Sequence, residues 1–329
     1  MSRRIVIVGD SPLSVLVGRQ LDRDLAREAH IEVAHLTRDE SFIYSPHITT
    51  LLGHQNFPLK NQLYRNVRSQ KTTVKQINLV DQRVITTIGV IDYDAICLDL
   101  TPSYGRSEIK KIGQLVTRLI NEIQAKFNSG RLLRARVTFA GEDIMSWQMA
   151  LALAADTVAY PVPIQRALLI QAQYPSITIL KEFLADNGVG SRKSVAPQPG
   201  LTINPPSSPL KNRLVRGALL DDKDNFVLRD TLNPEGHPES IVVDTKWRHR
   251  QNVLKVDQTL AVQIAANIER FLTGDRQRPI KLPRPSGILK GQKNDFVWIG
   301  DLESRRLKAK IIGQLDQRFY EKLFRQFNF

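Results

Sequence analysis

Residues 3–21 read RRIVIVGDSPLSVLVGRQL, in which a short apolar run, a polar turn and a second apolar segment follow one another. The run IVIV is typical of a buried strand, and the glycine after it indicates a tight turn. The segment after the turn spaces its apolar residues three and four apart, which predicts an amphipathic helix. IEVAHL at 31–36 predicts a second strand. Strand, turn, helix and strand in this order are typical of a Rossmann-like unit.

The same order recurs in the middle of the chain. From residue 137, VTFA predicts a strand, GEDIMS a turn and WQMALALAAD a helix. Two such starts predict an α/β fold with two Rossmann-like dinucleotide-binding units. Between them, residues 71–100 predict short strands and residues 107–127 a helix. The proline-rich residues 196–210 predict a loop.

Composition narrows the class of protein. The chain has 329 residues, of which 42% are apolar and 24% charged, as in a globular protein of about two domains. No apolar run is long enough for a membrane-spanning helix. The strand directly after MSRR leaves no room for a signal peptide, so we expect a cytoplasmic protein. The single cysteine, Cys97, excludes an internal disulfide framework.

Motifs for other chemistries are missing from the sequence. The histidines lack the spacing of metal ligands, so we expect no metal site. A nucleophile elbow and a phosphate-binding loop of the GxxxxGK type are also missing, so the sequence identifies no catalytic residue.

The charge is strongly positive, with a net value of +14 at pH 7. Residues 60–76, 189–217 and 276–293 contain lysine and arginine and no acidic residue. Such stretches fit an anionic membrane surface, an acidic protein partner or, less well, nucleic acid. A generally basic composition without a specific partner is the alternative.

Taken together, these segments resemble the FAD-dependent pyridine-nucleotide oxidoreductases. The closest resemblance is to the type II NADH dehydrogenases and the apoptosis-inducing-factor-like quinone reductases. The first glycine motif of that family falls on Gly9, Ser11 and Ser14. The acidic residue that ends the family's second strand falls on Thr37. The resemblance implies that these four positions contact FAD.

Further segments extend the resemblance along the chain. In FIYSP, Tyr44 and Pro46 match the aromatic residue and the proline that lie near the flavin ring in the family. YDAICLDLT at 93–101 matches the family's Tyr-Asp, strand and Ala-Thr-Gly, with Asp99 in place of the alanine. Asp244, after IVV, matches the aspartate that meets the ribitol, and Ala261 matches a helix start near the flavin. The resemblance thus implies a cofactor site formed by both halves of the chain.

The second glycine motif falls on Gly141, Asp143 and Ser146, which the resemblance assigns to NAD(P)H. Asp143 would bring a carboxylate to the place of a nucleotide pyrophosphate, and like charges about 4 Å apart repel by about 4 kcal/mol at an effective dielectric constant of 20. We interpret Asp143 as a helix cap. Gln148, at the position of a family glutamate, cannot titrate. Ordinary NADH binding is therefore not expected.

The resemblance covers nearly the whole chain and implies a discontinuous first domain. Residues 1–112 and 222–280 would form the FAD-type domain, residues 113–221 a degenerate NAD(P)-type domain, and residues 281–329 a basic, amphipathic C-terminal element. Two functions remain open. One is a divergent FAD-dependent NAD(P)H:quinone oxidoreductase. The other is a noncatalytic relative that keeps the fold as a scaffold for a membrane, an acidic protein partner or nucleic acid.

The C-terminal element has an apolar stripe with basic flanks. Its members recur every four residues, and phenylalanines follow them: Leu307, Ile311, Leu315, Phe319, Leu323, Phe324, Phe327 and Phe329. In the family such segments dock the enzyme on the membrane, where quinone is reached, so we expect peripheral binding to an anionic membrane. The alternative is that the first two turns of the stripe pack against the FAD-type domain.

Overall fold

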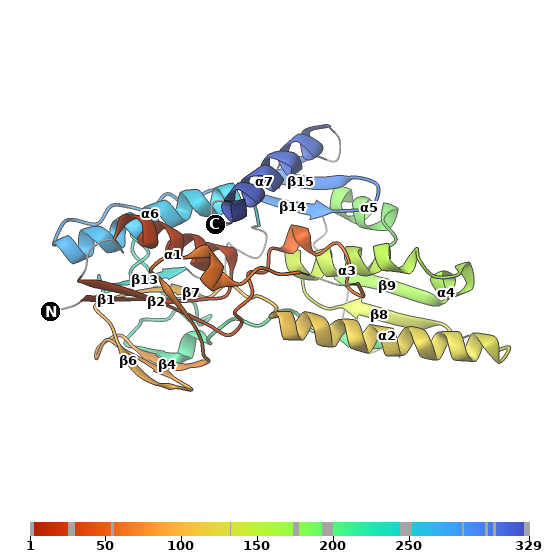
Figure 1. Ribbon diagram of the computed structural model, residues 1–329, viewed down its shortest axis with the longest axis horizontal. Helices are drawn as coiled ribbons and strands as arrows, with labels where there is room; N and C mark the ends of the chain where they lie inside the picture. The colour runs from red at the N-terminus through yellow and green to blue at the C-terminus, as the bar shows by residue number, and fades with distance from the viewer. Residues whose placement is uncertain are drawn as a thin grey trace.

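The computed structural model has an elongated α/β architecture with a parallel sheet at each end (Figure 1). It describes residues 3–25, 30–53, 56–131, 133–173, 178–192, 200–243, 252–284, 286–299, 302–304 and 307–325. Asp244, Phe327 and Phe329 lie outside the described residues.

The first unit is built on a five-stranded parallel sheet in the order β13-β7-β1-β2-β3. Its strands are β1 (Arg3–Val8), β2 (Ile31–Thr37), β3 (Arg68–Lys71), β7 (Ala95–Asp99) and β13 (Ser240–Val243). The outermost strand β13 follows the whole second unit in the sequence, so the first sheet combines distant parts of the chain.

The two faces of this sheet are buried against different partners. Ile5 and Ile7 of β1 pack with helices α1 (Pro12–Asp24) and α6 (Leu254–Thr273). Val6 and Val8 point the opposite way, because side chains alternate along a strand. They pack on a second sheet of order β12-β4-β5-β6. This sheet contains β4 (Val74–Asn78), β5 (Arg83–Thr86), β6 (Gly89–Asp92) and β12 (Val215–Arg216).

The second unit contains a four-stranded parallel sheet in the order β10-β9-β8-β11. Its strands are β8 (Ala135–Phe139), β9 (Leu168–Gln173), β10 (Gly190–Arg192) and β11 (Leu201–Ile203). The predicted loop at 196–210 is wrong at β11, because Leu201–Ile203 adds to β8. A three-residue strand flanked by prolines is too short for its apolar pattern to be recognised.

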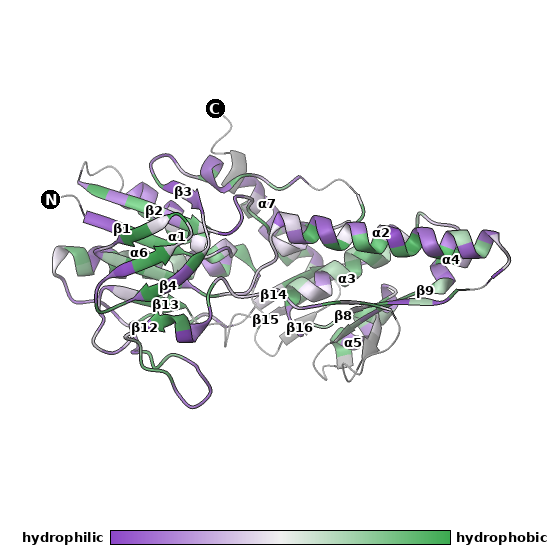
Figure 2. Ribbon diagram, turned by 90° about the horizontal axis from the view of Figure 1, so that it is seen from below, coloured by the Kyte–Doolittle hydropathy of each residue, from purple (hydrophilic) through white to green (hydrophobic). Residues whose placement is uncertain are grey.

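Helices cover both faces of the parallel sheet of the second unit, α3 (Ile144–Thr157) on one and α2 (Arg106–Asn128) on the other (Figure 1). The prediction of a helix at 107–127 is confirmed by α2, along which apolar and polar residues alternate as on a half-exposed helix (Figure 2). The shorter helices are α4 (Val162–Ala167) and α5 (Thr178–Asp186). By contrast, α3 is buried continuously from Ile144 to Ala154.

The reason for this burial is a fourth, antiparallel sheet, which covers the outer face of α3. It consists of β14 (Ser286–Lys290), β15 (Asp295–Ile299) and β16 (Leu302–Ser304), and helix α7 (Leu307–Arg325) follows it. The expected basic amphipathic element at 281–329 thus contains three strands that the sequence pattern did not reveal. They bring the C-terminal residues into contact with both units, since α7 also packs on α6.

Candidate functional site

The first glycine motif forms the turn between β1 and α1. A Cβ on Gly9 would lie 2.9 Å from the Cβ and the carbonyl oxygen of Asp99 and 2.9 Å from the Cβ of Ser14. Only glycine fits such a close approach of three segments. His35 supports the turn, with Nε2 placed 2.9 Å from the Gly9 carbonyl and Nδ1 placed 2.8 Å from the Tyr64 hydroxyl. Burial lowers the pKa of His35 to about 3, so the ring is neutral.

The N-terminus of α1 holds a carboxylate of this chain. Ser11 caps the helix and accepts from the Leu13 amide at 3.1 Å. Ser11 Oγ and the Ser14 amide both donate to Asp99 Oδ2, the latter at 3.1 Å. Asp99 is fully buried, and its other oxygen accepts from the Thr101 amide at 3.2 Å. A helix N-terminus of this kind is where dinucleotide-binding folds hold a phosphate. Asp99 therefore occupies the phosphate position.

The end of β2, where the family has its ribose-binding acid, holds an ion-paired cluster. Thr37 Oγ1 donates to Asp10 Oδ1 at 2.6 Å and accepts from Lys60 Nζ at 2.5 Å. Arg38 Nε donates to Asp10 Oδ2 at 2.6 Å, and Lys60 Nζ lies 3.5 Å from Asp10 Oδ1. Burial by itself would raise the pKa of Asp10, but the charges of Lys60 and Arg38 outweigh it and hold that pKa well below its usual range. The polar groups at this position are thus satisfied by one another.

Lys60 also corrects the expectation drawn from the basic stretch 60–76. Its side chain is fully buried, whereas Arg68 of the same stretch is 81% exposed. Burial lowers the pKa of Lys60, and Asp10 and Asp39 oppose that effect. Lys60 is therefore part of the interior and contributes nothing to a basic surface.

In the second glycine motif, as in the first, a carboxylate of this chain accepts hydrogen bonds at the N-terminus of the following helix. A Cβ on Gly141 would overlap the Asp143 carboxylate and the Ser146 hydroxyl. Asp143 Oδ1 accepts from the Ser146 amide at 2.9 Å, and Oδ2 accepts from the Ser146 hydroxyl at 2.7 Å. Burial raises the pKa of Asp143, and the Ser146 bonds oppose this. The prediction that Asp143 caps α3 is confirmed.

Gln148 has a structural task in place of the family glutamate. Its side chain is fully buried. Nε2 donates to the carbonyls of Ile48 and Lys290 at 3.0 and 3.2 Å, and Oε1 accepts from the Lys290 amide at 2.8 Å. One amide group therefore joins α3 to β14 and to the segment that follows Tyr44 and Pro46.

Tyr44 and Pro46 are both buried, and Tyr44 lies against the C-terminal helix α7. The Tyr44 hydroxyl donates to Asp316 Oδ2 of α7, and Asp316 Oδ1 accepts from the Leu254 amide at 3.0 Å. The ring of Tyr320 stacks on Tyr44 with centroids 5.5 Å apart. The segment that the family places at the flavin ring is thus covered by α7.

The predicted cofactor residues therefore form separate groups. Gly9, Ser11, Ser14 and Thr37 meet at one end of β1 and β2. Asp10 and Asp99, which were not among the predicted cofactor residues, lie with them. Ala261 is buried in the core of the first unit. A signal for Asp99 exists in the sequence: a lone acid that ends the buried run AICLD must find internal donors.

The apolar stripe of α7 is not the face that the helix buries along its first turns. Ala309, Gly313 and Asp316 are buried, whereas Ile311 and Leu315 are 47% and 58% exposed. Ile311 and Leu315 therefore do not pack inward as the alternative required, whereas Phe319 of the same stripe packs against the core of the first unit. None of the described helices is long and apolar enough to cross a membrane. Among the described residues, no three His, Cys, Asp or Glu side chains group to hold a metal ion.

Comparison with known proteins shows the fold. Neither a family model nor a curated relative matches the sequence. The sulfide:quinone oxidoreductase of Aquifex aeolicus matches with a TM-score of 0.69 at 12% identity, over 98% of this chain and 92% of that one. A chain of the Tetrahymena thermophila mitochondrial ATP synthase matches with a TM-score of 0.65 at 12% identity, over 99% and 96%. The flavoprotein disulfide reductase RclA of Escherichia coli matches at 0.52 and 10% identity, over 90% and 77%.

The chain thus has the fold of flavin-dependent oxidoreductases, and the predicted α/β fold with two Rossmann-like units is confirmed. At these identities the likeness is one of fold alone. The side chains present do not suit a dinucleotide in the family's position, since Asp99 and Asp143 hold both places where a pyrophosphate would lie.

Lys60→Met should lower the free energy of unfolding by about 3 kcal/mol, because it leaves Asp10 buried with one of its two cationic partners missing. Lys71→Met, at an exposed position of β3, is the control and should change it by less than about 0.5 kcal/mol. Urea denaturation measures both. Adding Asp10→Asn to Lys60→Met should recover part of the loss. Equal effects of the two lysine variants would contradict a buried ion pair.

Asp316 should make the folded state less stable as the pH rises. Burial raises its pKa from 3.8 to about 6, against the hydrogen bond from Tyr44. The folded state therefore favours the protonated acid, and the stability gained below about pH 4 is lost as the pH passes 6, by up to about 3 kcal/mol. Asp316→Asn should make the free energy of unfolding depend less on pH between pH 4 and 7. Asp222→Asn, on the surface, should leave this pH dependence unchanged. An unchanged slope in Asp316→Asn would exclude Asp316 as its source.

Proposed function

We propose that this chain uses the flavoprotein fold as a noncatalytic binding scaffold. The observation that carries the proposal is the pair of carboxylates at the N-termini of α1 and α3. Asp99 is buried and Asp143 is half-buried, and each accepts hydrogen bonds from the first turn of its helix. These are the donors that a dinucleotide phosphate requires, and here they have an internal acceptor.

The charge of the two acids makes the competition unequal. A pyrophosphate placed within about 4 Å of either carboxylate would be repelled by about 4 kcal/mol per pair of unit charges at an effective dielectric constant of 20. The helix N-terminus, worth about 1 kcal/mol to an anion, offsets little of this. The fold is therefore kept while its usual ligand is disfavoured at both sites.

A role in an assembly agrees with one of the structural matches. The Tetrahymena chain that this protein resembles along nearly its full length belongs to a structure of the mitochondrial ATP synthase. A fold of this kind is thus found as part of a large complex. The net charge of +14 favours an acidic protein surface as the partner.

The second candidate is the divergent FAD-dependent NAD(P)H:quinone oxidoreductase. It is supported by the likeness to the Aquifex sulfide:quinone oxidoreductase over 98% of the chain and by the glycines kept at Gly9 and Gly141. In this case Asp99 would have to turn away from α1. The cofactor would supply the hydride chemistry when bound.

Flavin titration separates the two functions. The purified protein should lack flavin absorption near about 450 nm and should not gain it when FAD is added. Asp99→Ala, which removes the carboxylate from the phosphate position, should bind FAD at least about tenfold more tightly than the wild type, in line with the loss of a repulsion of a few kcal/mol. Asp99→Asn keeps the size without the charge and separates the two contributions.

The same design applies to the second unit, where Asp143→Gly should raise the affinity for NADH, followed by its fluorescence. Asp186→Gly, on the surface of α5, is the matched control. A wild-type protein that binds FAD stoichiometrically and oxidises micromolar NADH would refute the scaffold proposal.

The surface of α7 supports a membrane as an alternative partner of the scaffold. Exposed Ile311 and Leu315 lie among the exposed cations Lys310, Arg318 and Lys322. Such a surface can lie in the headgroup region of an anionic bilayer.

Cosedimentation with phosphatidylserine vesicles tests this alternative. Replacing Ile311 and Leu315 by serine should weaken binding at low salt about tenfold, because two apolar side chains no longer leave water. Replacing the exposed Val158 and Val162 of the second unit by serine is the matched control. If the two double variants and the wild type sediment alike, α7 is not a membrane anchor.

A further inference from the structure

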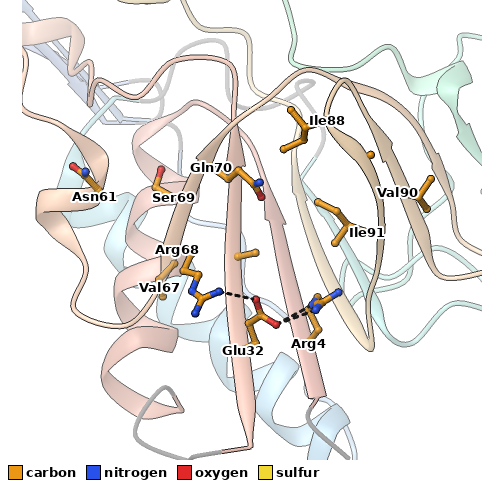
Figure 3. Close-up of a pocket in the computed structure, with 12 residues that line it drawn as sticks. Arg4, Glu32, Asn61, Val67, Arg68, Ser69, Gln70, Ile88, Val90 and Ile91 are labelled. Carbon is orange, nitrogen blue, oxygen red and sulfur yellow. Dashed lines mark hydrogen bonds and ion pairs between the residues drawn. The ribbon is translucent and has the colours of Figure 1, made fainter.

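A groove of about 640 Å³ runs between the first parallel sheet and strand β6 (Figure 3). Its base is the sheet face formed by β1, β2 and β3, and its other wall is β6 with the residue before it. Its polar lining includes Arg4, Glu32 and Arg68, and its apolar lining includes Ile88, Val90 and Ile91.

The groove exists because the two sheets separate at one end. Val6, Val8 and Leu36 fill the space between the sheets and are buried. Toward the beginning of the same strands, the residues on this face are Arg4 and Glu32, which are 42% and 36% exposed. Charged side chains cannot replace the apolar filling, so the space stays open to water.

Strand β6 borders the groove with an unpaired edge. Within the described chain it is the last strand of the order β12-β4-β5-β6. The amide of Tyr93, directly after β6, donates to the carbonyl of Gln82, directly before β5, at 3.0 Å. Because the direction of backbone groups alternates along a strand, the amides and carbonyls of Val90 and Asp92 point away from β5. They are available for another strand.

Apolar side chains beside this edge are exposed to water, as expected of a surface that a partner covers. Ile88 is 54% exposed and Val90 60% exposed, although both are strongly apolar. Figure 3 shows Ile88 and Ile91 on the side of β6 that faces the parallel sheet. A strand added to β6 would cover these side chains and fill the open end between the sheets.

The charge at the base of the groove favours an acid. Arg4 Nη2 and Arg68 Nη1 lie 3.0 and 3.7 Å from the two oxygens of Glu32. Two guanidinium groups thus share one carboxylate, which leaves one positive charge. Arg68 is 81% exposed and has donors to spare for a second carboxylate.

We propose that β6 receives an extended segment of a partner protein as an added strand, with an acidic side chain of that segment bound by Arg68 and Arg4. The inference rests on the proposed scaffold function and names its partner: an acidic peptide segment with β-branched residues. Backbone hydrogen bonds supply the affinity, and the groove selects alternate side chains. The exposed carboxylates of Asp92 and Asp94 flank the edge, so the segment fits with one acid placed over Arg68 and Arg4, whereas a polyanion such as nucleic acid would be repelled along the edge.

A random twelve-residue peptide library displayed on phage, panned against the full-length protein, tests the proposal. Enriched peptides should contain Asp or Glu among Val, Ile or Thr. Arg68→Glu should weaken the selected peptide about tenfold. Lys126→Glu, an equal charge change on α2, should leave the affinity unchanged. Hydrogen exchange should slow at residues 88–92 when the peptide binds.

Backbone methylation of the selected peptide tests the strand pairing without altering the protein. N-methyl groups on one set of alternate residues should abolish binding, and on the other set should not, because only every second amide faces β6. The proposal is overturned if no peptide is enriched, if Arg68→Glu binds normally or if both methylated sets behave alike. FAD titration of the same sample reports on the scaffold function separately.

Discussion

The first turn of α1 presents amide N–H groups that need an acceptor, and the carboxylate of Asp99 supplies it. This single interaction fixes the end of β7 against the β1–α1 turn, where Gly9 leaves no room for a side chain. In dinucleotide-binding folds a phosphate commonly accepts from such a turn. When the acceptor is part of the chain, the helix is completed without a ligand. Asp143 completes α3 in the same way.

The local part of the fold could be predicted from the sequence. The strand, turn and helix order of both units, the helix α2 and the cap at Asp143 all depend on residues within a few positions of one another. The role of Asp99 could not be predicted in this way, because its donors Ser11 and Ser14 are 88 and 85 residues away in the sequence. No periodic pattern encodes such a distance. The strands β14–β16 were missed for a related reason, since short apolar runs become strands only when they pair.

The sequence also does not show which basic residues are buried and which are exposed. The basic stretch at 60–76 contains Lys60, which is buried against Asp10, and Arg68, which is exposed and bound to Glu32. Both are basic residues in a stretch without acids, yet one stabilises the interior and the other faces a groove. Their acidic partners come from β2 and from the turn after β1. Only the tertiary structure distinguishes a cation that supports the fold from one that is available to a partner.

The position of β13 in the first sheet has a consequence for biosynthesis. The second unit's sheet is formed by residues 135–203, which leave the ribosome as one continuous segment. The first sheet is complete only after Ser240–Val243 has been synthesised, and the helix that covers it requires residues 254–273. Domains fold as units during synthesis once their residues have emerged. The second unit's parallel sheet is therefore expected to form before the first, whereas the N-terminal strands and the outer face of α3 stay uncovered until β13, α6 and β14 have also emerged.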